Sequence, residues 1–340
     1  MATLTNRTDL PILTLFNLDP AWEPEATEAV VAQTDQLVTE LRGMGHAVSD
    51  LAISDPNLHT RLQAFDPSST LVFNWCEELP GIPHSDSLVA QVLEELGFAY
   101  TGADPAVLSL AWHKPLVKAI LEAHGVPTPR WMLCSTPEID GWDCYPAIVK
   151  PAYEHCSYGV TVEAVVMNEK ELRERVALIL DTYGGPALVE DFVDGREFHV
   201  SLWGNGETSL LPIAEMDFSA FGDVRDRLCT YDSKFTPGST HYDAIQLKLP
   251  APLNEAQMQD LTRVSHAAYQ AIGCRDYGRL DIRLRDETFY VLDVNPNADL
   301  SADSSMACAA ELEGYTHGHM ISRLVNLAAA RSPVFAADSA

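Results

Sequence analysis

Two short segments in the last quarter of the chain carry four polar side chains that could bind a metal ion beside a phosphate. Apolar and charged residues alternate through RLDIRL and again through FYVLDVN, and a period of two residues predicts strands. An odd-length loop centred on Glu287 would set Asp281 opposite Asp293 and Arg279 opposite Asn295. Carboxylate and amide oxygens suit Mg2+, and an arginine can neutralise phosphate. The segments therefore predict a site for Mg2+ and phosphate, with a solvated hairpin face as the alternative.

Two lysines in the middle of the chain are candidates for phosphate binding. Lys150 ends an apolar strand predicted at 147–150, and the loop PAYEHCSYG follows it. Backbone amides of such a loop can hold phosphates while the lysine supplies the counter-charge. Lys234 lies in TYDSKF, a segment that could close as a lid. The spacing is that of neither a Walker A loop nor a dinucleotide GxGxxG motif, so an ordinary surface lysine is the alternative at position 150.

Two glutamates on the following strands could meet a nucleotide. Glu190 ends the apolar run ALVE, and Glu197 opens the next predicted strand, REFHVSLW. A carboxylate at a strand end among apolar side chains suits a nucleotide: backbone groups can bind the base edge, and Glu197 could accept hydrogen bonds from ribose hydroxyls. A routine strand, turn and strand is the alternative.

The N-terminal part of the chain alternates strands with helices. Strands are predicted at 11–16, 71–74 and 97–100, and helices at 25–43 and 85–96. This order predicts a small parallel α/β domain whose ligand loops lie at the carboxyl ends of the strands. The loop WCEELPGIPHS holds such a position.

The remainder of the chain predicts α+β units. A mostly helical stretch over 104–124 is interrupted at Pro115, which can begin a second helix. A strand at 159–164 and a helix at 168–180 follow the strand that ends in the lysine. Beyond them the chain is rich in strands, until Asn254, with Gln257 three residues later, caps another helix.

Composition limits the class of partner. A formal net charge of −27 over 340 residues excludes a general binder of nucleic acid or anionic membrane, and any ATP site must be locally basic. The seven cysteines are scattered and form no CxxC pair, which favours a reducing compartment. The apolar run at the N-terminus is too short for a signal peptide or a membrane span. A soluble cytoplasmic protein is expected.

These segments, in this order, resemble the ATP-grasp ligases, and among them the D-alanine–D-alanine ligase branch. YPAIVKPAYEHCSYGV looks like the second-lysine strand and flap of that family, ALVEDFVDGREFHV like its adenine hinge and ribose glutamate, and YDSKF like its third lysine. GRLDIRL and VLDVNPN look like its metal-binding strands. FAYTGADPAVLSLAWHKPLVKAILEAHGVPTP resembles its domain junction. The similarity runs from about residue 71 to 330.

The resemblance implies a three-domain ATP-grasp fold that combines α/β and α+β parts. It places an N-terminal parallel α/β preATP-grasp domain at 1–104 and a central lid subdomain at 105–187. A C-terminal catalytic subdomain with an antiparallel sheet would cover 188–332, followed by a flexible tail at 333–340. Related ligases are often dimers, so the resemblance allows a homodimer.

The resemblance also implies a role for each nucleotide-site residue. On the phosphates, Lys114 and Lys150 would contact the α- and β-groups, Ser157 would cover the terminal groups, and Lys234 would approach the γ-phosphate. The adenine would be held by Glu190 and by the backbone at Phe192 and Val193. Glu197 would bind the ribose. Phosphoryl transfer needs such residues because it depends on positioning and on neutralising negative charge.

The reacting groups follow from the same resemblance. Asp281, Asp293 and Asn295 would hold Mg2+, with Mn2+ as an alternative. Arg279 would stabilise the acyl-phosphate and tetrahedral states, and Ser304 aligns with the serine that binds the carboxylate of the second substrate. A carboxylate would attack the γ-phosphate of ATP, and an amine would then displace phosphate.

Three departures from the family pattern bear on the substrate. Asp293 stands where the family usually has the longer glutamate. The resemblance therefore does not decide whether one or two metal ions bind. Asp299 stands at a family glycine whose amide helps form the oxyanion site. The first loop, NLDPAWEPEATE, lacks the family's glycine-rich segment, and Glu23, Glu25 and Glu28 are all candidates for its acidic residue. The expected substrates are therefore amino-acid-like but not a pair of D-alanines.

The resulting expectation is an ATP- and Mg2+-dependent carboxylate–amine ligase that acts on small molecules. One alternative is an ATP-binding regulatory or scaffold protein of the same fold without turnover, and the intact set of lysines and metal residues counts against it. Another alternative, a metal-dependent hydrolase, would need ligands outside this set.

Overall fold

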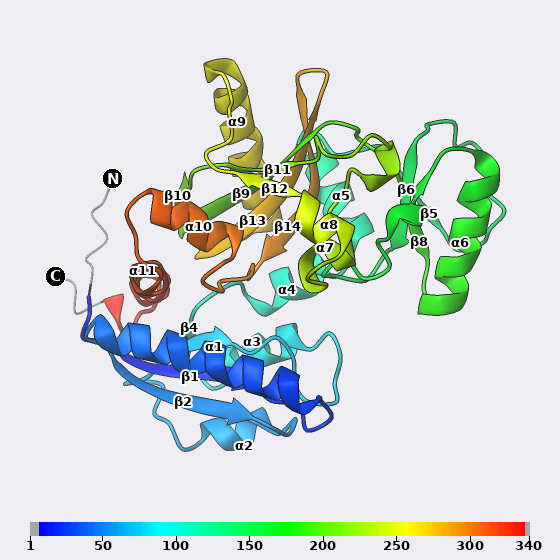
Figure 1. Ribbon diagram of the computed structural model, residues 1–340. Coiled ribbons are helices and arrows are strands. Elements are labelled where there is room, and N and C mark those ends of the chain that lie inside the picture. Colours follow the sequence, from blue (N-terminus) through cyan, green and yellow to red (C-terminus); the bar gives the residue numbers. More distant parts are fainter. Residues whose placement is uncertain (1–6, 337–340) are drawn as a thin grey trace.

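The computed structural model describes residues 7–336, which form three β-sheets with helices packed around them. Figure 1 shows the first sheet and α1 at the bottom, the third sheet and α9 above them, and the second sheet and α6 at the right. None of the helices in the described range is both long and apolar enough to cross a membrane.

The first sheet is parallel and built from the N-terminal part of the chain. Its strand order is β2 (Ala47–Ile53), β1 (Pro11–Asn17), β3 (Leu71–Trp75) and β4 (Ala99–Tyr100). The predicted parallel α/β unit is confirmed. The sequence prediction missed β2, because this edge strand buries only Ile53 fully and has no clear apolar face.

Helices cover both faces of the first sheet. These are α1 (Pro24–Gly43), α2 (Leu58–Leu62) and α3 (Asp86–Glu95), joined by the C-terminal α11 (His317–Ala330). Ile12 of β1 packs in one buried cluster with residues of α1 and α11, whereas its neighbour Leu13 packs in another with residues of α2 and α3. Successive side chains of a strand point to opposite faces, so β1 lies between two cores.

The second sheet is antiparallel. Its order is β5 (Trp131–Cys134), β8 (Ala187–Asp191), β6 (Ala147–Pro151) and β7 (Val165–Val166). Helix α6 (Glu169–Tyr183) packs on it, begins at an Asn168 cap and ends at Gly184 in the left-handed region. The predicted strand at 159–164 is wrong. Gly159 has a positive φ, and a short 3-10 helix (Val162–Ala164) precedes the two-residue β7.

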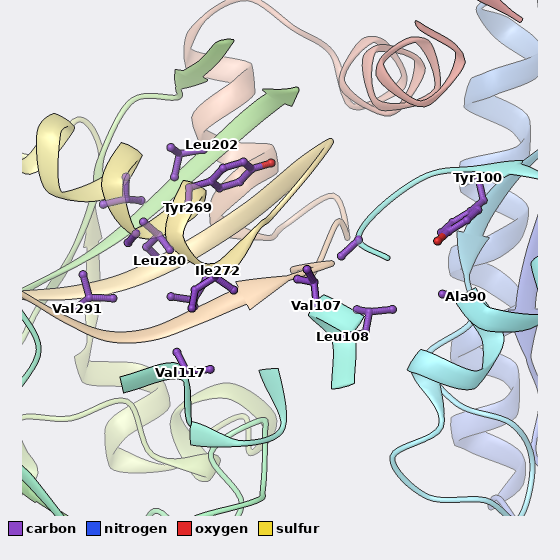
Figure 2. Close-up of a cluster of buried hydrophobic side chains, with 14 of the residues drawn as sticks. Ala90, Tyr100, Val107, Leu108, Val117, Leu202, Tyr269, Ile272, Leu280 and Val291 are labelled. Atoms are coloured by element: carbon purple, nitrogen blue, oxygen red, sulfur yellow. The ribbon is translucent and has the colours of Figure 1, made fainter. Parts of the chain in front are cut away.

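The third sheet carries most of the candidate site. Its order is β12 (Gln246–Lys248), β11 (Ala214–Asp217), β9 (Arg196–Asn205), β13 (Tyr277–Arg285) and β14 (Thr288–Pro296), with β10 (Glu207–Leu210) paired to β9. Helix α9 (Glu255–Ile272) covers one face, and its predicted Asn254–Gln257 capping box is confirmed. Figure 2 shows Tyr269 and Ile272 of α9 in the same buried cluster as Leu280 and Val291.

Short helices connect these parts. They are α4 (Pro105–Ala111), α5 (Lys114–Ala123), α7 (Tyr231–Phe235), α8 (Thr240–Ala244) and α10 (Ser305–Leu312). The predicted break at Pro115 is confirmed, since α5 starts one residue before it. Of the predicted tail, residues 337–340 lie outside the described range, and Phe335 is buried in the core beside α1 and α11.

The β13–β14 hairpin sets the register of the candidate metal residues. Asp281 lies opposite Asp293, and Arg279 lies opposite Asn295, as predicted. The predicted odd-length loop is wrong, because the turn consists of two residues, Asp286–Glu287, both with positive φ. A two-residue turn of this kind matches the twist of the paired strands.

A β-bulge restores the predicted pairing. Ile282 pairs with Val291 while the preceding residue pairs with Asp293, so Leu292 is an extra residue in β14. Without the bulge, Asp293 would point to the same face as Phe289 and Val291, which are buried in the core. The extra residue turns the Asp293 carboxylate to the opposite, polar face.

Candidate active site

A cleft of about 1040 Å3 is lined by residues from all three sheets. The lining includes the loop after β3, the start of α5, the segment 154–158 after β6, which we call the flap, and the polar face of the third sheet. Its lining includes all the residues predicted to contact the nucleotide, the metal ion or the reacting phosphate: Lys114, Lys150, Ser157, Glu190, Phe192, Val193, Glu197, Lys234, Arg279, Asp281, Asp293 and Asn295.

The two aspartates of the hairpin are each held by a basic side chain. Arg279 donates from Nε and Nη2 to the Asp281 carboxylate at 2.7 and 3.2 Å. Asn295 Nδ2 donates to Asp281 Oδ2 at 3.2 Å, and Lys114 Nζ lies 2.8 Å from Asp293 Oδ2. These contacts keep two carboxylates and an amide on one wall of the cleft.

Both aspartates are ionised over the physiological pH range. Burial raises the pKa of Asp281, but Arg279 and His199 outweigh it and lower the value to about 2. Burial likewise opposes ionisation of Asp293, and Lys114 and His155 hold its pKa below the ordinary value. Ionised oxygen donors on one face fit a hard divalent cation such as Mg2+.

A buried carboxylate of the cleft lining lies between two lysines. Glu190 is 1% exposed, and its oxygens lie 2.9 Å from Lys118 Nζ and 3.0 Å from Lys150 Nζ. Burial raises the pKa of Glu190, but the two lysines outweigh it and lower the pKa below its ordinary value. The group therefore carries two positive charges and one negative charge beside the cleft.

Sequence reasoning missed Lys118. It lies four residues after Lys114 on α5, so both lysines share one face of that helix. Lys118 Nζ also donates to Thr128 Oγ1 at 2.9 Å, and the Thr128 hydroxyl donates to the Val291 carbonyl at 2.8 Å. The helical spacing was the available signal, but only the fold shows which lysine meets Glu190.

Arg283 is a second residue that sequence reasoning did not single out. It donates from Nε to Glu197 Oε2 at 2.7 Å and from Nη1 to the Val193 carbonyl at 2.9 Å. Its guanidinium lies over the Phe192 ring, 4.7 Å from the centroid. Arg283 thus fixes the predicted ribose glutamate and the predicted adenine hinge relative to each other.

The flap is tied to the segment around α7. Cys156 and Ser157 both have positive φ, and Ser157 Oγ donates to the Cys229 carbonyl at 3.2 Å. The rings of Tyr158 and Tyr231 lie 5.3 Å apart. Lys234 of α7 is exposed and lines the cleft from this side. Flap and α7 therefore cover the cleft together.

The other end of the cleft is aromatic and acidic. The Trp112 ring stacks on His84 at 3.9 Å and meets the edge of His155 at 4.2 Å, and its Nε1 donates to Asp86 Oδ1 at 3.0 Å. Glu77 also lines this end. Desolvation within the cleft and the nearby carboxylates, chiefly that of Asp299, raise the pKa of Glu77.

Sequence comparison identifies the relatives of this chain. Residues 122–326 match the family model described as the D-ala D-ala ligase C-terminus. The chain belongs to the D-alanine–D-alanine ligase family. It is 30% identical to a D-alanine–D-alanine ligase of Marinomonas sp. (strain MWYL1), with 88% of this chain and 91% of that protein covered. It is 32% identical to the uncharacterized protein y4sG of Sinorhizobium fredii (strain NGR234), with 86% of each chain covered.

Structural comparison confirms the ATP-grasp fold of this family member. The crystal structure of D-alanine–D-alanine ligase from Bacillus anthracis complexed with ATP superposes with a TM-score of 0.72 at 19% identity. The match covers 94% of this chain and 97% of that one. The predicted combination of parallel and antiparallel sheets is thus the architecture of the D-alanine–D-alanine ligases.

Of the residues that the family resemblance linked to substrate, Asp299 lines the cleft and the others do not. Ser304 is not among the residues that line the cleft; its Oγ caps α10 by accepting from Ala307 N at 3.2 Å. Asp299 lines the cleft, and its carboxylate accepts from the Ser301 amide and hydroxyl. The first-loop candidates are exposed and absent from the cleft lining: Glu23, Glu25 and Glu28.

Proposed function

We propose that the protein is an ATP- and Mg2+-dependent carboxylate–amine ligase that forms an amide bond through an acyl phosphate. The observation that carries the proposal is the pairing of Asp281 with Asp293 on one wall of a cleft whose other walls hold Lys114, Lys150 and Lys234. Two ionised carboxylates among three separately positioned lysines suit a metal–triphosphate ligand.

At the nucleotide end, lysines that now pair with carboxylates of the protein would pair with the phosphates of ATP instead. Lys114 and Lys150 would turn toward the phosphates, while Glu190, shared with Lys118, keeps a counter-charge behind them. Glu197, oriented by Arg283, would accept hydrogen bonds from the ribose. Asp281, Asp293 and Asn295 would hold Mg2+, which supplies neutralisation of the phosphate charge.

The reaction would proceed in two steps. A substrate carboxylate oxygen forms a bond to the γ-phosphorus while the bond to the ADP oxygen breaks. The neutral amine then attacks the acyl carbon and forms the C–N bond. The tetrahedral state collapses, inorganic phosphate leaves with the acyl C–O bond pair, and the extra proton on nitrogen passes to solvent or to the departing phosphate. Arg279, which shares the polar face of the third sheet with the metal residues, would stabilise the negative oxygens of both steps. Lys234, on exposed α7, would approach the γ-phosphate when the cleft closes.

The acidic end of the cleft supports an amine-bearing, amino-acid-like substrate. Glu77, Glu78 and Asp86 line it together with Trp112. A carboxylate can pair with an ammonium group, and an aromatic ring face adds cation–π attraction. This lining differs from the substrate residues expected from the family pattern, which supports substrates other than a pair of D-alanines.

The test is a hydroxylamine-trapping assay with ATP, Mg2+ and a panel of amino acids. Hydroxylamine intercepts an acyl phosphate, so the expected result is hydroxamate formed in step with ADP. Omission of the amino acid provides the control for plain ATP hydrolysis. Tight ATP binding with no ADP release across a broad panel would contradict the ligase and support a nucleotide-binding protein without turnover.

A further inference from the structure

Three side chains of different chemistry converge on one wall of the cleft. The carboxylate of Glu197, the imidazole of His199 and the thiol of Cys229 place one donor atom each within 4.8 Å of one another. Glu197 and His199 are 5% and 8% exposed. Cys229 is partly buried. An oxygen, a nitrogen and a sulfur donor at this separation are the pattern of a site for a borderline-soft metal ion.

The imidazole is the centre of this group. His199 Nε2 lies 3.9 Å from Glu197 Oε1 and 3.9 Å from Asp281 Oδ1. Within residues 7–336 the ring makes no hydrogen bond, although it is more than nine-tenths buried. Glu197 and His199 are two residues apart on β9, so they share a face, and Asp281 pairs with His199 across the sheet.

The neighbouring arginines orient the carboxylates. Arg283 Nε donates to Glu197 Oε2 at 2.7 Å, which leaves Oε1 directed at the imidazole. Residues that hydrogen-bond to the ligands of a metal ion hold those ligands in position and raise the affinity for the metal. Two ligands about 2.0 to 2.1 Å from a tetrahedral Zn2+ are about 3.4 Å apart, so the 3.9 Å separation requires only a small side-chain rotation.

We propose that Glu197, His199 and Cys229 form a binding site for Zn2+ or a chemically similar ion such as Co2+ or Cd2+. The ion would bond to Glu197 Oε1, His199 Nε2 and Cys229 Sγ. The thiol S–H bond breaks as the metal–sulfur bond forms, and the proton passes to solvent. Water or Asp281 Oδ1 would take the fourth position. The donor set differs from the all-oxygen set proposed for Mg2+.

The site has a consequence for the enzyme that rests on the proposed function. Glu197 is the proposed ribose residue, and Asp281 is a proposed Mg2+ ligand. A soft ion bound between them would occupy both, so it would exclude Mg2+–ATP. The cleft would then alternate between a nucleotide-bound state and a zinc-bound, inactive state.

Co2+ titration of the full-length, metal-free protein tests the site directly. Bound Co2+ with a thiolate ligand gives a charge-transfer band in the near ultraviolet, and the expected result is one equivalent of Co2+ with that band. Cys229→Ser should abolish the band, and His199→Asn should weaken Co2+ binding by about tenfold or more. Cys156→Ser is the matched control, because this thiol also lines the cleft but lies outside the cluster, and it should keep the band.

Two outcomes of that titration overturn the proposal: no thiolate band, or a band that persists in Cys229→Ser. Competition then tests the overlap with the nucleotide. Saturating Mg2+–ATP should raise the apparent Kd for Co2+ by about tenfold or more. A cysteine-dependent band that Mg2+–ATP leaves unchanged would defeat the overlap. Because the readout is absorbance and not turnover, a failure of the ligase proposal in the hydroxamate assay remains distinguishable from a failure here.

Discussion

The two ends of the cleft differ in how their charges are balanced. At the proposed nucleotide end, Glu190 is held by two lysines and Glu197 by Arg283. At the proposed substrate end, Glu77 and Glu78 lie near further carboxylates, and neither forms an ion pair within residues 7–336. Where basic side chains already pair with carboxylates, they can exchange those partners for the phosphates of a nucleotide. An unpaired acidic end can gain its first partner from a cationic ligand, and this is where substrate choice would be made.

Replacing a proposed metal ligand tests the proposed nucleotide end most severely. Asp281→Asn should lower turnover by about 1000-fold or more, because it removes an ionised ligand from a metal ion that supplies several kcal/mol of transition-state stabilisation. The measurement is ADP release at saturating substrates. Asp286→Asn, at the exposed turn of the same hairpin, is the matched control and should remain active. Comparable rates for the two variants would contradict the site assignment.

Removing the buried counter-charge tests whether pairing stabilises the nucleotide end. Glu190→Gln leaves Lys118 and Lys150 without their carboxylate, and we expect the free energy of unfolding to fall by about 3 kcal/mol. Urea denaturation measures this change. Glu174→Gln removes an exposed carboxylate of α6 that pairs with Lys170, and it should cost about 0.5 kcal/mol or less. Equal losses in the two variants would show that the buried group does not stabilise the fold.

The acidic end should discriminate substrates without affecting ATP. Glu77→Gln should raise the KM for the amine substrate by about tenfold, equivalent to about 1.4 kcal/mol, and leave the KM for ATP unchanged. Steady-state kinetics with each substrate varied in turn separates the two constants. Glu313→Gln, an exposed glutamate outside the cleft lining, serves as control. An equal rise in both constants would mean that the two ends are not independent.

The pH dependence of the two KM values tests the same difference between the two ends, with the smallest expected effect. The raised pKa of Glu77 means that this carboxylate gains a proton at a higher pH than an ordinary glutamate. As the pH falls through that raised value, the negative charge is lost and the amine KM should rise. The ATP KM should stay level, because the pKa of Asp281 is lowered to about 2 and its charge persists. The rise in amine KM should disappear in Glu77→Gln; an unchanged profile in that variant would assign the titration to another group.

The order of motifs along the chain was enough to predict the fold, because each motif combines a strand end with a charged residue of a particular type. The cross-strand pairing of Asp281 with Asp293 was also predicted. Its cause, the extra residue Leu292, was not predicted. The available signal was the shift of the apolar positions, from Phe289 and Val291 on one face to Leu292 and Val294 on the other.

The charge partners at the site could not be predicted from sequence. Lys118 and Glu190 meet only after α5 packs beside the second sheet, and a buried lysine has no local signature that separates it from a surface lysine. The same applies to Arg283, whose hydrogen-bond partners lie in the segment 193–197 and at Arg227. The loop that carries Glu77 was predicted as a ligand loop and does line the cleft. Its substrate was not predictable, because loops vary in length and composition more than the strands that hold them.

The packing of α11 against the first sheet constrains how the chain folds during synthesis. Ile12 lies in β1, which leaves the ribosome long before α11, yet Leu324 and Val325 of α11 complete its core. That face of the first sheet therefore stays uncovered until α11 has been made, while the second sheet and α6 already have the partners of their own buried cluster. A strand made early is thus protected from aggregation only after a helix made much later packs on it.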